Sequence, residues 1–331
     1  QTAHLTNSVG CDSAAMLNLS VTPSTVISTT NITACGSYTW NGNTYTQSGT
    51  YISPISGCDI HVLNLTITHE LLLSAKVFLL GAYDSIVGKM HDSLRVKGLI
   101  PTMEPYSAAP FNKAVISELA GETVSSSVLA ITGDNAIVDW VFVELRSASN
   151  PATIVATKRA LVQRDGDIVS AVDGISPVPF FNMPNDDYYI SIKHRNHLGI
   201  QTQNTINMVS CIPTVFDFTS SLNVYTIPSQ PANSNYASQK LIGSTYLMWS
   251  GDARYNKNVK YNGLNNDRDF VLTSLGGVGF INTTLNQVYR SEDINMDGKV
   301  RYNNTDNDRV VILNNLGVST PNNVINQHTS N

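Results

Sequence analysis

Oxygen-bearing side chains recur at fixed spacing near the end of the 331-residue chain, where residues 293–298 read Asp-Ile-Asn-Met-Asp-Gly. Calcium is a hard cation that takes six to eight oxygen ligands, and loop positions one, three and five can place three of them around one point. Glycine at position six permits the sharp turn of such a loop. The spacing therefore predicts a structural calcium site with side-chain ligands from Asp293, Asn295 and Asp297.

The other ligands of this loop are expected further along the chain. The backbone carbonyl at position seven, here that of Lys299, usually supplies an oxygen. Position twelve holds Asn304 and not the familiar acidic residue. We expect Asp308, four residues later at the start of a helix, to take that role in an extended loop. The alternative is an Asx-rich turn that binds no metal.

The same stretch occurs a second time, 41 residues earlier. Residues 251–262 align with residues 292–303 without a gap, so that Asp252 matches Asp293, and the later Asp267 matches Asp308. The candidate ligands of this first copy are its remaining acidic and amide positions, namely Asp252, Asn256, the carbonyl of Asn258, and Asp267.

The first copy is expected to be the poorer metal site. Arg254 occupies position three and Lys257 replaces the glycine, so positive charge falls where a cation would bind. Either these side chains swing away and calcium binds, or one of them bonds Asp267 and replaces the ion structurally.

Each copy is followed in the sequence by a short predicted helix. Asn265 or Asn266 is expected to cap the first helix, which ends at Gly276. Asp306 or Asn307 is expected to cap the second, which ends at Gly317. The remaining tail, residues 319–331, is rich in Asn and polar, so it is expected to be flexible or to become ordered on a partner.

The front of the chain contains a different duplication. Residues 45–67 match residues 1–21 with one residue inserted, so residues 1–22 read as a partial β repeat and residues 23–69 as a complete one. A disulfide between Cys35 and Cys58 would staple a unit too small to bury a large core. The natural partner of Cys11 would then lie upstream, which indicates a fragment of a longer protein. Cys211 is expected to be a buried free thiol.

Residues 70–225 read as short strands with turn signals between them, which predicts an antiparallel β-sandwich. His194 and His197 could bind zinc, but residues three apart on a strand face opposite sides. We expect instead that Arg195 and Asn196 start a turn and that both rings bond backbone carbonyls. Residues 226–331 complete the chain as the duplicated loop module and its tail. The predicted fold class is mainly β, with a small C-terminal α module.

Composition excludes several functions. Charged residues make up 14% of the chain and the net charge is −5, whereas a nucleic-acid partner requires a basic face. No apolar run approaches the roughly 20 residues of a membrane span. No Gly-x-Ser-x-Gly, His-Glu-x-x-His or phosphate-binding glycine loop occurs, so no enzyme activity is predicted.

Residues 34–51 (ACGSYTWNGNTYTQSGTY), with 57–59 (GCD) and 63–67 (LNLTI), resemble the tandem repeats of very large adhesin-like or haemagglutinin-like surface proteins of the Bacteroidota. Residues 139–146, 160–169 and 188–202 are similar to a block near the C-terminus of such proteins. The duplicated loops resemble a dockerin, although the spacing inside each loop is longer.

The resemblance implies a non-catalytic adhesin at the cell surface, exported by the type IX secretion system. The terminal module would then serve as a secretion or anchoring signal, and the adhesin would bind a surface glycan or protein. The alternative is a dockerin-type assembly module joined to a carbohydrate-binding sandwich. In that case Trp140 and Trp249 are candidates for stacking on a sugar, although Trp140 lies in an apolar strand typical of a core.

Overall fold

The computed structural model describes residues 2–16, 25–54, 59–109, 121–220, 223–227 and 236–330. The protein divides into two compact units, Gln1–Thr68 and His69–Asn331. Both are built mainly from strands, which confirms the predicted mainly β class. The finer division into four parts stays a prediction.

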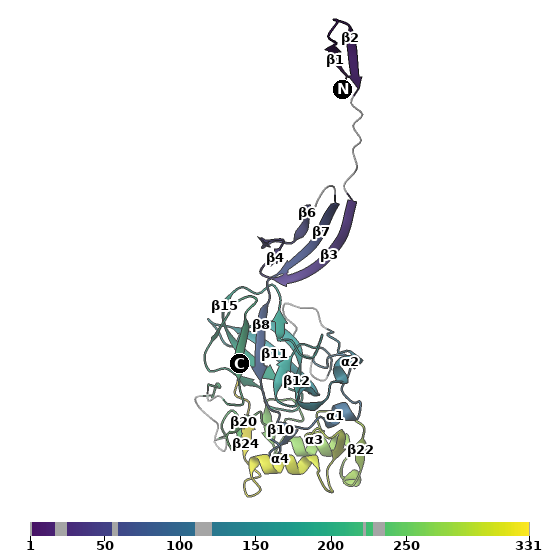
Figure 1. Cartoon of the computed structure of the whole chain (residues 1–331). Coiled ribbons are helices and arrows are strands. Elements are labelled where there is room, and N and C mark those ends of the chain that lie inside the picture. The colour runs from purple at the N-terminus through teal and green to yellow at the C-terminus, as the bar shows by residue number, and fades with distance from the viewer. Residues whose placement is uncertain are drawn as a thin grey trace. The chain divides into compact units, whose positions relative to one another are not determined.

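The first unit consists of three small sheets (Figure 1). Its strands are β1 (Thr2–Thr6), β2 (Asp12–Met16), β3 (Thr25–Cys35), β4 (Tyr38–Trp40), β5 (Asn43–Tyr45), β6 (Gly49–Pro54) and β7 (Asp59–Thr68). β7 lies between β6, which is antiparallel to it, and β3, which is parallel. Asn41 and Gly42 both have positive φ at the β4–β5 turn, as the Asn-Gly pair predicts.

The second unit contains one nine-stranded sheet in the order β14-β8-β13-β12-β11-β15-β16, with β17 on β15 and β18 on β8. The strands are β8 (Leu71–Lys76), β11 (Ile137–Ser147), β12 (Ile154–Gln163), β13 (Asp167–Val169), β14 (Val178–Phe180), β15 (Asp186–Lys193), β16 (Ile200–Gln201), β17 (Ile206–Met208) and β18 (Pro213–Asp217). β8 alternates buried and half-buried residues, whereas the central β11 is buried on both faces. The parallel pairing of β18 with β8 was not predicted from the sequence.

Short elements surround this sheet. The helices are α1 (Ser93–Val96), α2 (Ser126–Leu129), α3 (Asp267–Ser274) and α4 (Asp308–Leu316), with 3-10 turns at Gly133–Asn135 and Val278–Phe280. The two-stranded sheets pair β9 (Tyr83–Asp84) with β10 (Lys89–Met90), β19 (Lys240–Ile242) with β20 (Thr245–Leu247), β21 (Asn258–Lys260) with β24 (Val324–Asn326), and β22 (Thr284–Asn286) with β23 (Lys299–Arg301). No helix of the described residues is long and apolar enough to cross a membrane.

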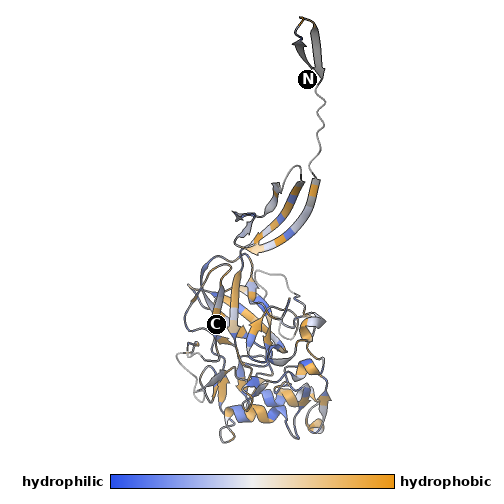
Figure 2. Ribbon diagram, viewed as in Figure 1, coloured by the Kyte–Doolittle hydropathy of each residue, from blue (hydrophilic) through white to orange (hydrophobic). Residues whose placement is uncertain are grey.

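The terminal module has its own apolar core, in which matching positions of the two copies meet. Val259 and Val300, Val271 and Ile312, and Leu275 and Leu316 are all buried there. α3 and α4 lie beside each other, and each shows both polar and apolar stretches (Figures 1 and 2). One shared core therefore holds the two loops in a fixed relation.

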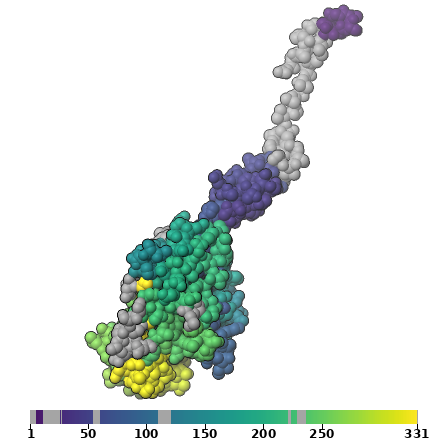
Figure 3. All heavy atoms as spheres, turned by 90° about the vertical axis from the view of Figure 1, so that its left-hand side faces the viewer, coloured from purple at the N-terminus to yellow at the C-terminus, as the bar shows by residue number. Residues whose placement is uncertain are grey.

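The described part of the tail packs against its own unit. β24 pairs with β21, and the next residues run along the large sheet, where His328 and Thr329 are buried. Arg146 of β11 donates to the carbonyl of Ser330 at 2.8 Å. Figure 3 shows yellow C-terminal residues both at one end of the unit and among residues of the sheet. The described tail therefore finds its partners within its own unit, which the sequence did not predict.

Candidate metal centre

Loop 1 (residues 252–267) and loop 2 (residues 293–308) follow the same backbone path. Left-handed residues occur at four matching positions, each 41 residues apart: Tyr255 and Met296, Lys257 and Gly298, Gly263 and Asn304, and Asn265 and Asp306. Such conformations are uncommon for residues other than glycine. Their recurrence in register indicates that the sequence duplication is also a structural one.

The first acid of each loop accepts backbone N–H groups from positions five and six. Asp293 accepts from Asp297 at 3.0 Å and from Gly298 at 2.8 Å. Asp252 accepts from Asn256 at 2.8 Å and from Lys257 at 3.0 Å. Each carboxylate oxygen can take about two partners, so these bonds leave lone pairs for a metal ion.

The last acid of each loop folds back onto the loop's beginning. Asp308 accepts from the N–H groups of Ile294 at 2.7 Å and Arg301 at 2.8 Å. Asp267 accepts from Arg254 at 3.2 Å and from Lys260 at 2.8 Å. Each is the first residue of its helix, so the extended loop closes as the sequence requires.

The two helices begin at the predicted caps. The side chain of Asn266 accepts from the N–H of Asp269, and that of Asn307 accepts from Val310. Of the two candidates offered for each helix, these are the ones that cap it. The caps fix the helix starts and therefore the positions of Asp267 and Asp308.

Two predicted ligand oxygens of loop 1 lie beside the Asn256 amide. With the amide nitrogen facing them, Asn256 donates to the Asn258 carbonyl at 3.2 Å and to Asp252 Oδ1 at 3.3 Å. The three predicted ligands are therefore neighbours. Asn258 Oδ1 is buried and finds no hydrogen-bond partner among the described residues.

The arginine of loop 1 turns away from this point. The Arg254 side chain is exposed, and its guanidinium lies 5.0 Å from the centre of the Phe270 ring. Its bond to Asp267 comes from the backbone N–H. The Arg254 guanidinium therefore does not take the place of a cation between the two acids.

In loop 2 the middle ligands are partly engaged. Asn295 Oδ1 accepts from the N–H of Asp297 at 3.2 Å, and Asp297 Oδ1 accepts from Lys299 at 2.9 Å. Asp297 Oδ2 also forms a 2.8 Å ion pair with Arg301. Arg301 therefore competes with a metal ion for the negative charge of Asp297. The spacing of residues in the sequence did not indicate this ion pair.

Each loop carries two buried acids close enough to repel each other. Burial raises the pKa of Asp293 to about 7, with Arg195 partly opposing the shift. Burial also raises the pKa of Asp308 well above its ordinary value, and the charge of Asp293 adds to that rise. Burial and then Asp252 do the same for Asp267. A divalent cation would stabilise both carboxylates, because it supplies the opposite charge that the pair lacks.

The donor set therefore fits a hard cation such as calcium. Within the described residues no three carboxylate, imidazole or thiol side chains converge on a metal position. Loops 1 and 2 do not depend on such a trio, since they combine two acids with amide and carbonyl oxygens, which are ligands that calcium accepts.

The two histidines take part in a buried polar network beside the module. Their Nδ1 atoms lie 2.9 Å apart, because the chain turns after β15. His194 bonds the Asp139 carboxylate at 3.1 Å, and His197 Nε2 accepts from the N–H of Gly81 at 3.0 Å. The rings do not face apart, because β15 ends at Lys193 and the chain turns before His197. The expectation that both rings bond backbone carbonyls was wrong, since they contact a carboxylate, a backbone N–H and each other.

Asp139 is the charged centre of this network. Arg195 donates to its carboxylate at 2.9 Å, and the Tyr289 hydroxyl donates at 2.6 Å. Burial alone would raise the pKa of Asp139, but Arg195, His194 and Tyr289 outweigh it and hold the pKa at about 2. The pair of Asp139 and Arg195 is therefore charged at neutral pH.

Other predicted residues are placed as follows. Trp140 and Trp249 are 0% and 4% exposed, so neither presents a ring for stacking on a sugar.

Cys211 is disulfide-bonded, which corrects its prediction as a free thiol. Cys35 is also disulfide-bonded, Cys58 lies outside the described residues, and Cys11 is an exposed free thiol.

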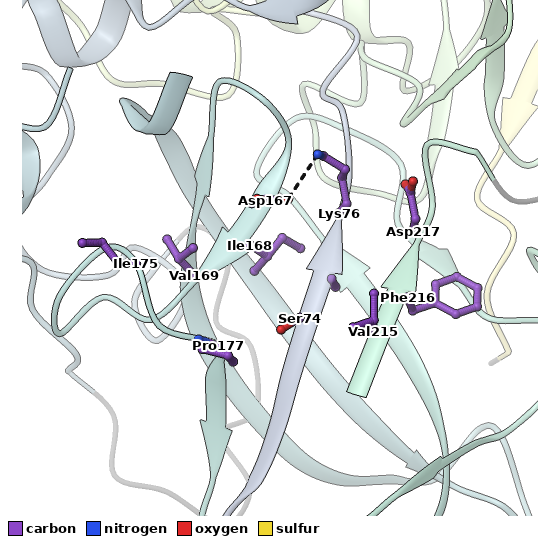
Figure 4. Close-up of a pocket in the computed structure, with 11 residues that line it drawn as sticks. Ser74, Lys76, Asp167, Ile168, Val169, Ile175, Pro177, Val215, Phe216 and Asp217 are labelled. Carbon is purple, nitrogen blue, oxygen red and sulfur yellow. Dashed lines mark ion pairs between the residues drawn. The ribbon is translucent and has the colours of Figure 1, made fainter. Parts of the chain in front are cut away.

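A pocket of about 280 Å³ lies along β8, between β13 and β18. Figure 4 shows Ile175 and Val215 on opposite sides of β8, and a 3.3 Å ion pair joins Lys76 to Asp167. No residue of loop 1 or loop 2 lines it, so this pocket is separate from the candidate metal centre.

Comparisons with protein families, with curated proteins and with solved structures find no match for this chain. The functional conclusion therefore depends on the chemistry of the two loops and on the sequence resemblance.

Proposed function

We propose that the terminal module is a calcium-stabilised structural element, with loop 2 the stronger site and loop 1 the weaker. The observation that carries the proposal is the buried pair of acids in each loop. In both loops the last acid accepts from a backbone N–H near the loop's start and from the N–H of position nine, which is Arg301 in loop 2 and Lys260 in loop 1. Asp293, Asn295, Asp297, Asp308 and the carbonyl of Lys299 would hold the ion in loop 2. Calcium would stabilise the fold because it binds only the folded loops.

We further propose that the chain belongs to a large extracellular surface protein of the adhesin type. Its role would be non-catalytic, and the terminal module would be recognised by type IX export or anchoring machinery. The resemblance of residues 34–67 supports this reading, and the low charged fraction is compatible with it. The disulfide-bonded Cys35 and Cys211 fit an oxidising compartment.

Calorimetric titration of the full chain with calcium tests the metal proposal. Two binding events are expected, and Asp308→Asn should abolish the tighter one. Asp267→Asn is the matched control, because it changes the equivalent residue of loop 1 and should abolish only the weaker event. A wild-type chain that binds no calcium would refute the site.

Deletion of residues 245–331 tests the export proposal. Surface display in the native host should be lost, because the recognised module is gone. Deletion of residues 1–68, which form a separate compact unit, is the control and should leave display intact. Normal display of the first truncation would exclude an export role for the module.

A further inference from the structure

Side chains around the large sheet hold the backbone of loop 2 from outside. The carbonyls of positions one, three and five each lie against a side-chain nitrogen from another segment. Asn196 donates to the carbonyl of Asp293 at 2.7 Å. His91 Nε2 lies 3.1 Å from the carbonyl of Asn295, and the Lys97 ammonium donates to that of Asp297. The three residues that supply metal ligands therefore have their carbonyls directed away from the ion position.

Loop 1 satisfies two of the equivalent carbonyls, those of positions one and five, within itself. The carbonyl of Asp252 accepts from the N–H of Tyr255 at 3.2 Å, and that of Asn256 accepts from the Asn258 side chain at 3.3 Å. Asn196 touches this side only through its own carbonyl, which accepts from Gly251 at 2.9 Å. The external clamp is thus specific to loop 2.

Close packing reinforces the clamp. A Cβ atom on Gly81 would lie 2.1 Å from the carbonyl oxygen of Ile294, so only glycine lets the loop approach this closely. The side chain of Met296, at position four, is buried in the core of the large sheet. Loop 2 is therefore attached to the sheet by hydrogen bonds and by apolar packing together.

We infer that Asn196, His91 and Lys97 are positioning residues for calcium in loop 2, and that calcium bound there fastens the module to the large sheet. The inference depends on the proposed calcium site. Holding the three carbonyls outward pre-orients the side chains of Asp293, Asn295 and Asp297 toward one point. Because coupling between two binding equilibria is reciprocal, calcium should tighten the same contacts that favour its binding.

The test titrates calcium into the full chain carrying Asp252→Asn, so that the signal reports loop 2. In this background Asn196→Ala and Lys97→Met should each weaken calcium binding about tenfold, the effect expected when support for ligand residues is lost. Lys97 is exposed, so its variant keeps the test valid if Asn196→Ala does not fold. Asn207→Ala, on β17, removes an exposed hydrogen bond to Asp187 of β15 and is the matched control, with unchanged affinity.

Hydrogen exchange supplies the second readout. Calcium should slow amide exchange across residues 91–99 in the wild type, and Asp293→Asn should abolish that slowing. If the wild type binds calcium while both clamp variants bind it as tightly as Asn207→Ala, the clamp is refuted and the calcium site stands. If the wild type binds no calcium, both the site and the clamp are refuted.

Discussion

Loop 1 shares most of the backbone geometry of loop 2, although it lacks two of the residue types expected of a calcium loop. Both loops bury an acid at each end, and both share four left-handed positions. They differ at positions three, five and six, and, among the described residues, in the clamp that loop 2 receives. The comparison shows that amide-to-carboxylate bonds can hold the loop's shape without the residue types expected at positions three and six. We expect position three and the surroundings to set the calcium affinity of each loop.

The largest expected effect comes from removing the acid that closes a loop. Asp308→Ala leaves two backbone N–H groups without their acceptor, and each such loss costs about 1–3 kcal/mol. In a chelator, Asp267→Ala should cost a similar amount, because Asp267 also accepts two backbone N–H bonds. In calcium, Asp308→Ala should cost more. Urea unfolding of both variants in each condition measures this, and equal losses in calcium would contradict the ranking of the loops.

Lowering the pH tests the buried polar network beside loop 2. In this network Arg195 donates both to the Asp139 carboxylate and to the carbonyl of Arg290. The pKa of Asp139 is about 2 in the folded protein and about 3.9 when unfolded, so the unfolded state binds more protons between these values. Stability from this group is therefore present above about pH 4 and is lost as pH falls toward 2, by roughly 2 kcal/mol.

Asp139→Asn should flatten this acid limb of the stability curve, measured by urea unfolding from pH 2 to pH 6. The control, Asp186→Asn at the exposed start of β15, should keep the wild-type shape. If Asp139→Asn keeps the acid limb of the wild-type stability curve, the role assigned to Asp139 in acid stability is contradicted.

A smaller effect is expected at position six of loop 2. Gly298→Ala places a Cβ on a residue with φ of 77°, and that atom would lie 2.5 Å from Leu99 Cδ1. The strain should cost about 1–3 kcal/mol and weaken calcium binding. Thermal unfolding with and without calcium measures both effects. An unchanged melting temperature would show that loop 2 shifts freely to accommodate the new side chain, which would contradict the clamp.

The smallest effect is expected at the same position of loop 1, where Lys257 already has φ of 71°. Lys257→Gly relieves that conformation but makes the unfolded chain more flexible, so stability should rise by no more than about 1 kcal/mol. Calcium affinity of loop 1 should rise as well, because a positive charge is removed. Isothermal titration in an Asp293→Asn background measures it, and unchanged affinity would show that charge at position six is irrelevant.

The sequence by itself determined the features that depend on neighbours along the chain. The two loops, their closing acids, the caps Asn266 and Asn307, and the Asn41-Gly42 turn follow from residue type and fixed spacing, because their hydrogen bonds join residues at most 15 positions apart. The burial of Trp140 followed from its apolar strand. Which of the loops' oxygens a metal ion would use is a question that spacing alone left open.

Only the tertiary structure decided what touches the loops from elsewhere. Asn196 meets Asp293 across 97 positions, and His91 meets Asn295 across 204. The parallel pairing of β18 with β8 and the course of the tail are long-range in the same way. Such contacts depend on strand register and on the packing of distant segments, which no local spacing encodes. The sequence therefore indicated two metal loops, and the fold decided which of them is clamped.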